Sequence, residues 1–276
     1  MPFTVASFHA HPDDEAFLVA GTLARLAADG NRVILIVATG GEAGLAAGAL
    51  TEGLAELRRK ELREAARVLG CSEVLFLGYD DSGMDGSAGV ESFARAPVEQ
   101  AAVKLAAILG ELEADALTVY DPAGGYGHPD HVQVHRVGVR AAELAGTPLV
   151  LEATVDRRAL LRALRLLKAL KLAPADWAPD RFLGAWANPE RLTHRVDVRP
   201  WIEQKRLAMA AHASQATADE GTRTLAYFLR FPPFLFRLAF GHEWFVERHR
   251  ERGPRLIDDP LESLRNARDQ GGARSR

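Results

Sequence analysis

The chain has a single cysteine among its 276 residues, Cys71, so it cannot form an internal disulfide. No secretory signal is expected, because the N-terminal MPFTVASFHAHPDDE has no basic segment and its carboxylates begin at residue 13. No apolar run reaches the roughly 18 residues that a membrane-spanning helix requires. These absences predict a protein without a transmembrane segment that works in the reducing cytoplasm.

An excess of charge of one sign is absent as well. Lysine and arginine number 34 against 37 aspartate and glutamate residues, a net charge of −3, so no basic field indicates a nucleic-acid partner. The sequence contains no internal repeat of fixed period. Hydrophobic residues make up 47% of the sequence, which is enough to build a sizeable core.

Residues 1–155 alternate between strand and helix patterns. Apolar runs predict strands at 4–10, 32–39, 73–78, 116–121 and 148–155, and helical spacing predicts helices at 14–30, 52–70, 98–112 and 130–145. Nearly continuous apolar strands between helices are typical of a parallel sheet covered on both faces. The fold class is therefore predicted to be α/β, a Rossmann-like doubly wound and mostly parallel sheet, with residues 1–155 as its core.

The C-terminal part is less regular. Residues 156–260 are expected to complete the same domain and to form the substrate pocket, with a strand at 193–198 and a helix at 200–215. Residues 157–172 carry six basic residues and no acidic one, which indicates a solvated helix face or, alternatively, a face for an anionic surface or substrate. The aromatic stretch 228–245 indicates core, a pocket wall or a homo-oligomer interface. Residues 261–276 are polar and expected to be a flexible tail.

Polar residues gather where the predicted strands end. HPDDE follows the first strand, GGEAG the second, GYDDSG the third and GGYGHPDH the fourth. Ligands of an open parallel sheet bind outside the carboxyl ends of its strands. We therefore expect these four loops to line one crevice.

The side chains in these loops suit metal-dependent hydrolysis. Histidines and carboxylates without a nearby cysteine favour an imidazole–carboxylate metal site, and three protein ligands with one open position are typical of catalytic zinc, although Fe²⁺ accepts the same ligands. A remaining carboxylate can act as a general base, and a remaining histidine can protonate a leaving group or stabilise an oxyanion. Asp13 and Asp14 are adjacent, so one ligand and one base is the simplest division.

The motifs AHPDDE, TGGEAG and GGYGHPDH resemble those of the LmbE/PIG-L family of zinc-dependent N-deacetylases. The match covers about residues 4–150, and KRLAMAAHASQ (205–215) extends it. RRKELREAARVLG and GYDDSGM are similar to the mycothiol-pathway branch, which comprises a glucosaminyl-inositol deacetylase and a mycothiol-conjugate amidase. The resemblance implies a metal-dependent hydrolase that removes an acetyl or other acyl group from the amide nitrogen of a small-molecule amino sugar or its conjugate.

The resemblance also implies roles for individual residues. The zinc ligands would be His11, Asp14 and His131, and Asp13 would be the general base. His128 would act as general acid or charge stabiliser, held by the carboxylate of Asp130, which would raise the histidine pKa. Other positions match residues that contact the substrate: Tyr126 on the amide carbonyl, and Arg58 and Asp81 on the sugar or inositol.

Two other functions are compatible with these residues. A metal-dependent phosphoesterase acting on a sugar phosphate could use the same side chains, but such enzymes often employ two metals and more carboxylates. A non-catalytic sugar- or lipid-binding protein would leave Asp13 and His128 without a purpose. The remaining histidines are interpreted as structural: His9, His135, His194, His242 and His249, with no role assigned to His212. Cys71 is expected to be an inert core thiol.

Overall fold

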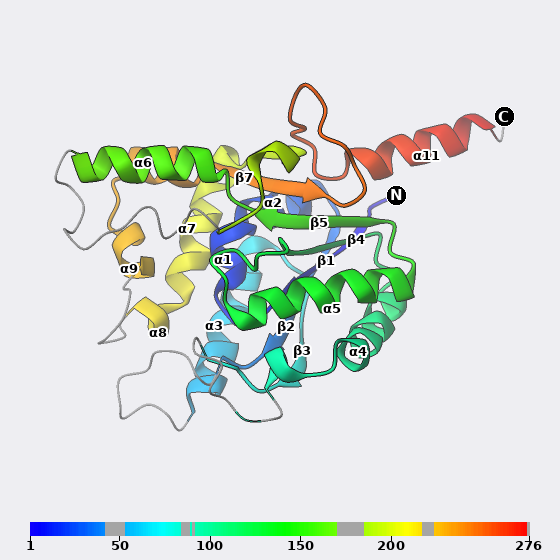
Figure 1. Cartoon of the computed structure of the whole chain (residues 1–276), viewed down its shortest axis with the longest axis horizontal. Helices are drawn as coiled ribbons and strands as arrows, with labels where there is room; N and C mark the ends of the chain where they lie inside the picture. The colour runs from blue at the N-terminus through cyan, green and yellow to red at the C-terminus, as the bar shows by residue number, and fades with distance from the viewer. Residues whose placement is uncertain (42–52, 84–88, 90–91, 170–184, 217–223, 275–276) are drawn as a thin grey trace.

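A computed structural model describes the chain except for residues 42–52, 84–88, 90–91, 170–184, 217–223 and 275–276. One seven-stranded sheet has the order β3-β2-β1-β4-β5-β7-β6 (Figure 1). The strands are β1 (Thr4–His9), β2 (Arg32–Thr39), β3 (Glu73–Tyr79), β4 (Ala116–Tyr120), β5 (Leu149–Thr154), β6 (His194–Asp197) and β7 (His242–Glu247). The first five are parallel, whereas β7 is antiparallel to both β5 and β6. The predicted Rossmann-like α/β fold is thus confirmed.

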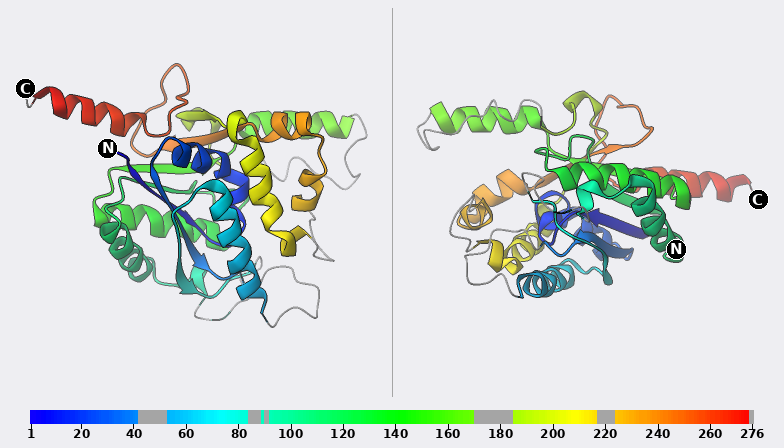
Figure 2. Two further views of the ribbon diagram at one scale, coloured as in Figure 1. Left: turned by 180° about the vertical axis from the view of Figure 1, so that it is seen from behind. Right: turned by 60° about the horizontal axis from the view of Figure 1, so that its bottom comes forward.

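Helices cover both faces of this sheet (Figure 2). They are α1 (Asp14–Leu18), α2 (Ala20–Ala28), α3 (Leu54–Leu69), α4 (Val98–Glu111), α5 (Pro129–Ala145), α6 (Arg157–Ala169), α7 (Ile202–Ala211), α8 (Ala213–Ala216), α9 (Thr224–Leu229), α10 (Pro233–Phe240) and α11 (Glu262–Arg274), with short 3-10 turns at Phe93–Arg95, Pro189–Arg191 and Arg199–Trp201. Alternate residues of each strand face opposite layers. Val33 and Leu35 of β2 join a core with α2, α3 and α7, and Ile34 and Ile36 join one with α4 and α5.

The predicted helix at 14–30 is two helices. The chain leaves helical geometry at Val19, and α2 then begins a new N-terminus. The carboxylate of Glu243, from β7, accepts hydrogen bonds from the backbone amides of Gly21 (2.9 Å) and Thr22 (2.7 Å). These amides have no partner within the helix, so a distant carboxylate stabilises its start. Lys205 of α7 donates to the same carboxylate at 2.7 Å, and both side chains are buried.

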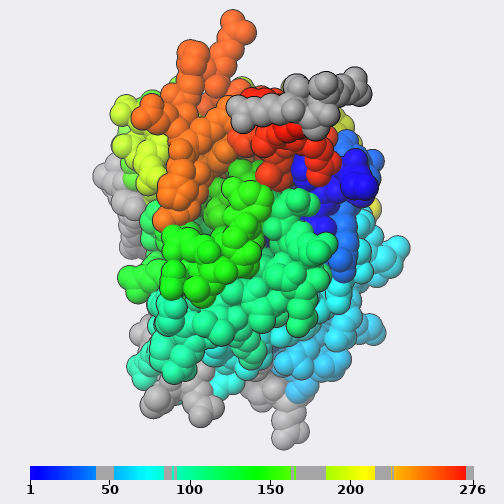
Figure 3. All heavy atoms as spheres, turned by 90° about the vertical axis from the view of Figure 1, so that its right-hand side faces the viewer, coloured from blue at the N-terminus to red at the C-terminus, as the bar shows by residue number. Residues whose placement is uncertain are grey.

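The C-terminal residues differ from the expectation of a flexible tail, because residues 262–274 form α11. Leu264 packs against the core beside β1. Arg268 lies over the ring of Phe3 at 3.8 Å and donates to the carbonyl of Met1 at 2.5 Å. Figure 3 shows this helix beside the N-terminal residues. Composition alone missed it because few residues carry the contact, namely Leu261 and Leu264 in the core and Arg265 and Arg268 over the ring of Phe3.

The basic and aromatic stretches lie at one side of the molecule (Figure 1). Arg158 of α6 pairs with Glu190 at 2.8 Å, and residues 170–172 of the predicted basic helix lie outside the described part of the chain. In α10, Phe236 is buried whereas Phe234 is exposed. No described helix is long and apolar enough to cross a membrane. The cytoplasmic location stays a prediction.

Candidate active site

The polar loops meet at the point where the strand order reverses, between β1 and β4. Strand β1 has β2 on one side and β4 on the other, so the loops after β1 and β4 diverge and leave a crevice between them. His11 lies just beyond β1, His128 and His131 lie at the start of α5 beyond β4, and Asp81 follows β3. The loop after β2 lies mostly outside the described residues. The predicted convergence of the other three loops is confirmed.

Three buried histidines form the centre of this crevice. The ring centroids of His11 and His128 are 4.8 Å apart, those of His128 and His131 are 4.9 Å apart, and those of His11 and His131 are 5.6 Å apart. Each ring offers a nitrogen within 4.8 Å of the others. A second group of possible ligands overlaps with it and joins His11 and His128 to Asp81 and Asp130. The two groups share two histidines, so among the described residues they mark one site.

Asp14 lies between His11 and His131. Its Oδ2 is 3.3 Å from His11 Nδ1 and its Oδ1 is 3.2 Å from His131 Nε2. Burial alone would raise the pKa of Asp14, but the neighbouring His131 and His11 hold that pKa well below its usual range. Metal ligands about 2.1 Å from a tetrahedral ion are roughly 3.4 Å from each other, which is close to both separations.

The donor set fits a divalent metal ion. His131 Nε2 is buried and makes no hydrogen bond of good geometry with any described residue, although Asp14 is within ion-pair distance. A buried polar atom without a partner is costly unless another group binds it. An imidazole nitrogen beside a carboxylate and a second imidazole is the environment that zinc and iron(II) accept.

Asp13 has an uncommon backbone conformation beside this set. Its φ of 120° is rare for a residue with a side chain, and its amide donates to Glu15 Oε2 at 3.1 Å. Burial raises the pKa of Asp13 to about 6, and Arg58 only partly opposes that rise. A carboxyl group that titrates near neutral pH suits a general base.

Arg58 supports the loop that carries Asp13. Its side chain is buried; Nη2 donates to the carbonyl of Pro12 at 2.7 Å, and Nη1 donates to that of Gly41 at 2.6 Å. Nη2 also lies 3.5 Å from Asp13 Oδ2. These protein partners occupy the guanidinium that the resemblance assigns to substrate. Asp81, the other expected substrate contact, lies 3.3 Å from His11 Nε2 and accepts from the amide of Gly83 at 2.9 Å.

Asp130 holds His128 through its backbone and not through its carboxylate. Its amide donates to His128 Nδ1 at 3.1 Å. Its carboxylate instead accepts from the Ser82 hydroxyl at 2.5 Å and lies 3.1 Å from His11 Nε2. The expected rise in the histidine pKa is wrong as well, because burial and the nearby His11 and His131 outweigh Asp130 and lower the pKa of His128 to about 4.

Aromatic residues border the histidines. Tyr126 is half exposed, with its ring centroid 5.2 Å from that of His131 and 6.3 Å from that of His128. Burial of its hydroxyl and the nearby Asp14 raise the pKa of Tyr126. Tyr120, which the sequence did not single out, stacks on His131 with centroids 4.4 Å apart.

A buried contact between His212 and Glu15, next to Asp13, was not predicted from the sequence. His212 Nε2 lies 2.6 Å from Glu15 Oε1. Its position in the HAS segment of residues 205–215 was the only signal.

Other histidines and Cys71 lie outside the candidate ligand groups, as expected. His9 is packed in β1 between Ser7 (2.7 Å) and the Tyr120 hydroxyl (3.3 Å). His135 contacts the carbonyl of Tyr120 at 3.0 Å. Burial raises the pKa of the Cys71 thiol to about 12, which disfavours the reactive thiolate.

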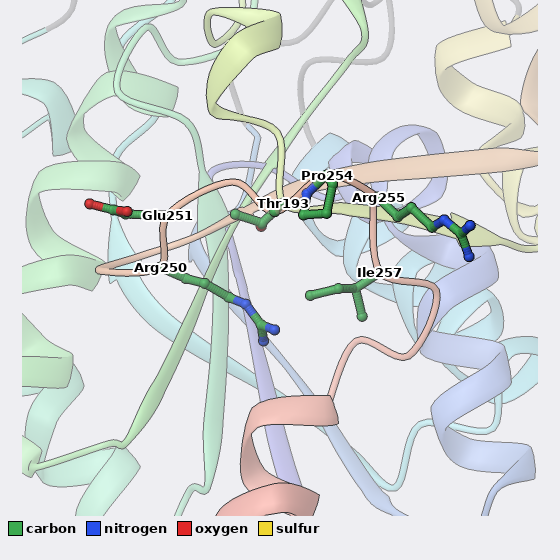
Figure 4. Close-up of a pocket in the computed structure, with 7 residues that line it drawn as sticks. Thr193, Arg250, Glu251, Pro254, Arg255 and Ile257 are labelled. Atoms are coloured by element: carbon green, nitrogen blue, oxygen red, sulfur yellow. The ribbon is translucent and has the colours of Figure 1, made fainter.

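A separate hollow of about 270 Å³ lies far from this crevice. It is lined by Thr193, Arg250, Glu251, Gly253, Pro254, Arg255 and Ile257 (Figure 4). The loop that forms it leaves β7 beside the beginning of β5, because Glu247 pairs with Leu151. The hollow is thus at the opposite edge of the sheet from His11.

Comparisons with known proteins agree with this geometry. Residues 6–142 match the family model described as PIG-L: GlcNAc-PI de-N-acetylase. The chain is 35% identical to a 1D-myo-inositol 2-acetamido-2-deoxy-alpha-D-glucopyranoside deacetylase of Thermomonospora curvata, over 91% of this chain and 92% of the relative. A protein of the same name from Thermobifida fusca is 38% identical, over 78% and 84% of the two chains.

A solved structure shares the fold. The N,N'-diacetylchitobiose deacetylase from Pyrococcus horikoshii superposes with a TM-score of 0.60 at 21% identity, over 88% of this chain and 83% of that one. That likeness concerns the fold, whereas the extent of the sequence matches shows that the chain belongs to the PIG-L family of N-deacetylases.

Proposed function

We propose that the chain removes the acetyl group from the amide nitrogen of an N-acetylglucosaminyl-inositol or a closely related amino-sugar conjugate. The two relatives are deacetylases of 1D-myo-inositol 2-acetamido-2-deoxy-alpha-D-glucopyranoside, which is an N-acetylglucosaminyl-inositol. The observation that carries the proposal is the position of Asp14 between His11 and His131, with Asp13 and His128 beside them. Neither a phosphoesterase nor a non-catalytic binding protein accounts for this arrangement together with these relatives.

A divalent ion, zinc or alternatively iron(II), would be held by His11, Asp14 and His131. When bound, such an ion supplies Lewis acidity, which polarises a carbonyl oxygen and makes a water molecule more acidic. The geometry supports this ligand set, because both carboxylate oxygens of Asp14 are directed at the two histidines.

Asp13 would act first as general base and then as general acid. Its carboxylate takes a proton from the attacking water and gives it to the amine nitrogen as the C–N bond breaks, since an unprotonated amine anion is a poor leaving group. The pKa of about 6 suits both directions of transfer near neutral pH. Arg58 keeps this carboxylate and its loop in place through Pro12.

His128 would stabilise charge as a neutral imidazole. Because the Asp130 amide donates to Nδ1, the ring proton is on Nε2, and this N–H can donate to the oxygen of the tetrahedral intermediate. A lowered pKa is compatible with this role and opposes that of a cationic general acid. The Tyr126 hydroxyl would donate a hydrogen bond to the same oxygen. Asp81 Oδ2 would accept a hydrogen bond from a hydroxyl of the sugar or inositol.

The test is hydrolysis by the purified protein. With N-acetylglucosaminyl-inositol, free amine and acetate should appear in equal amounts, and a chelator should stop their release until zinc or iron(II) is restored. A sugar phosphate offered in parallel tests the alternative chemistry. Phosphate release without acetate release would contradict the proposal.

A further inference from the structure

His212 and Glu15 form a buried pair that the proposed reaction does not use. They are 197 positions apart in the sequence, and His212 Nε2 lies 2.6 Å from Glu15 Oε1. Both side chains have no solvent exposure. A carboxylate removed this completely from water needs a partner, because Glu15 alone would be a buried charge without compensation, and His212 provides that partner.

The second oxygen of Glu15 is used by the backbone of Asp13. The Asp13 amide donates to Glu15 Oε2 at 3.1 Å, while His212 occupies Oε1. The φ of 120° at Asp13 is an unfavourable conformation for a residue with a side chain, and it persists only when neighbouring groups hold it. The carboxylate of Glu15 is such a group.

His212 is itself fixed from the other side. It interrupts the helical run between α7 and α8, and Ser214, two residues later, donates to Glu61 of α3 through its amide (2.8 Å) and its hydroxyl (2.6 Å). The Asp13 loop is therefore held by two anchors. One is Arg58, which donates to the Pro12 carbonyl, and the other is His212, which acts through Glu15.

We propose that His212 is a positioning residue for the deacetylation: through Glu15 it fixes the backbone of Asp13, and thereby the direction of the Asp13 carboxylate. The inference rests on the proposed function, because it takes Asp13 as the group that moves the proton. It assigns a catalytic purpose to the C-terminal part of the chain, which contributes no ligand to the proposed metal site.

Two conservative substitutions separate this role from a general effect on folding. In His212→Gln the side-chain amide nitrogen can reach the place of Nε2 and donate to Glu15, whereas in His212→Asn it can reach only the place of Nδ1. We expect His212→Asn to lower kcat by roughly 10- to 100-fold, the usual cost of displacing a reacting group by about 1 Å, with KM and metal content unchanged. His212→Gln should recover most of this loss.

A double-substitution cycle tests whether the effect passes through Asp13. Adding His212→Asn to Asp13→Asn should cost nothing further, because the group that His212 positions is already disabled. A further loss equal to that in the wild-type background would show a general structural effect and overturn the proposal. His194→Asn, which changes another buried histidine away from the site, should leave kcat as in the wild type.

A crystal structure of His212→Asn decides the inference without an activity. In this variant the φ angle of Asp13 should move away from 120°. An unchanged φ at Asp13 would overturn the proposal. If the wild-type protein releases no acetate, the proposed function fails, while this structural comparison still shows whether His212 holds the Asp13 backbone.

Discussion

Asp14 Oδ1 lies 3.2 Å from His131 Nε2, although the two residues come from the ends of strands that are more than 100 positions apart in the chain. This contact joins the two HPD motifs of the sequence into one site. It is also the contact that a divalent ion would replace with two metal–ligand bonds.

Removing either histidine ligand should remove the ion. The wild-type protein should contain about one divalent ion per chain by elemental analysis, whereas His11→Ala and His131→Ala should contain almost none, because two ligands bind much more weakly than three. His135→Ala, one helical turn after His131, is the matched control and should retain the ion. Full retention in both ligand variants would refute this ligand set.

Asp13→Asn should keep the ion and lose turnover. As a base and not a ligand, Asp13 contributes to proton transfer only, so kcat should fall on the order of 100-fold or more while the metal content stays at the wild-type level. Steady-state kinetics with metal analysis of the same sample measure both quantities. Asp115→Asn, at the opposite edge of the sheet, is the control for loss of an aspartate. Wild-type turnover in Asp13→Asn would exclude it from the mechanism.

His128→Ala distinguishes a charge-stabilising residue from a fourth ligand. His128 is close enough to both other histidines to belong to a ligand group, yet the proposal directs its Nε2–H at the substrate. We expect unchanged metal affinity and a fall in kcat on the order of 100-fold, the usual cost of removing one oxyanion donor. Metal titration under competition with a chelator provides the affinity. A large loss of affinity would instead make His128 a ligand.

Acid should destabilise the fold in part through His194. Burial and the nearby Arg250 lower the pKa of this histidine from 6.5 to about 4. The unfolded chain therefore binds a proton more readily, so this contribution to stability is full above pH 6.5 and declines as the pH falls toward 4, by at most about 3 kcal/mol. Urea unfolding of the wild type and His194→Asn at neutral and acidic pH measures the decline. The variant should lose less stability, and identical losses would show that another group is responsible.

Glu243 should be more important for stability than its partner Lys205. Glu243→Ala removes the acceptor for two amides of α2 and leaves the Lys205 ammonium buried alone, so a loss of about 3–5 kcal/mol is expected. Lys205→Met should cost less, because the carboxylate keeps both amide donors. Urea midpoints of the two variants give the order, and the reverse order would contradict this account.

The strands and the convergence of their loops were predictable because both follow from short segments. Five apolar runs specify the parallel strands, and the rule for parallel sheets then places His11 near His131. The addition of β7 between β5 and β6 was not predictable, since strand order at that edge depends on pairing between distant segments.

Local sequence was misleading at Asp130. Its nearness to His128 suggested a carboxylate–imidazole contact, but residues two positions apart at the start of a helix do not face each other. The carboxylate reaches Ser82, which comes from the loop after β3. The contact between His212 and Glu15 could not be predicted from local sequence, because the two residues are 197 positions apart and the segment 205–215 does not indicate a partner.

The long separation of that pair also sets the order in which the site can be completed during synthesis. A nascent chain that ends after β5 already contains the proposed ligands and Asp13, but Glu15 has no imidazole partner and the start of α2 has no carboxylate. Domains synthesised from the N-terminus fold as their contacts become available. We therefore expect the chain to reach full activity only after β7 has been synthesised, and a product that ends after β5 to carry the catalytic motifs with an impaired site.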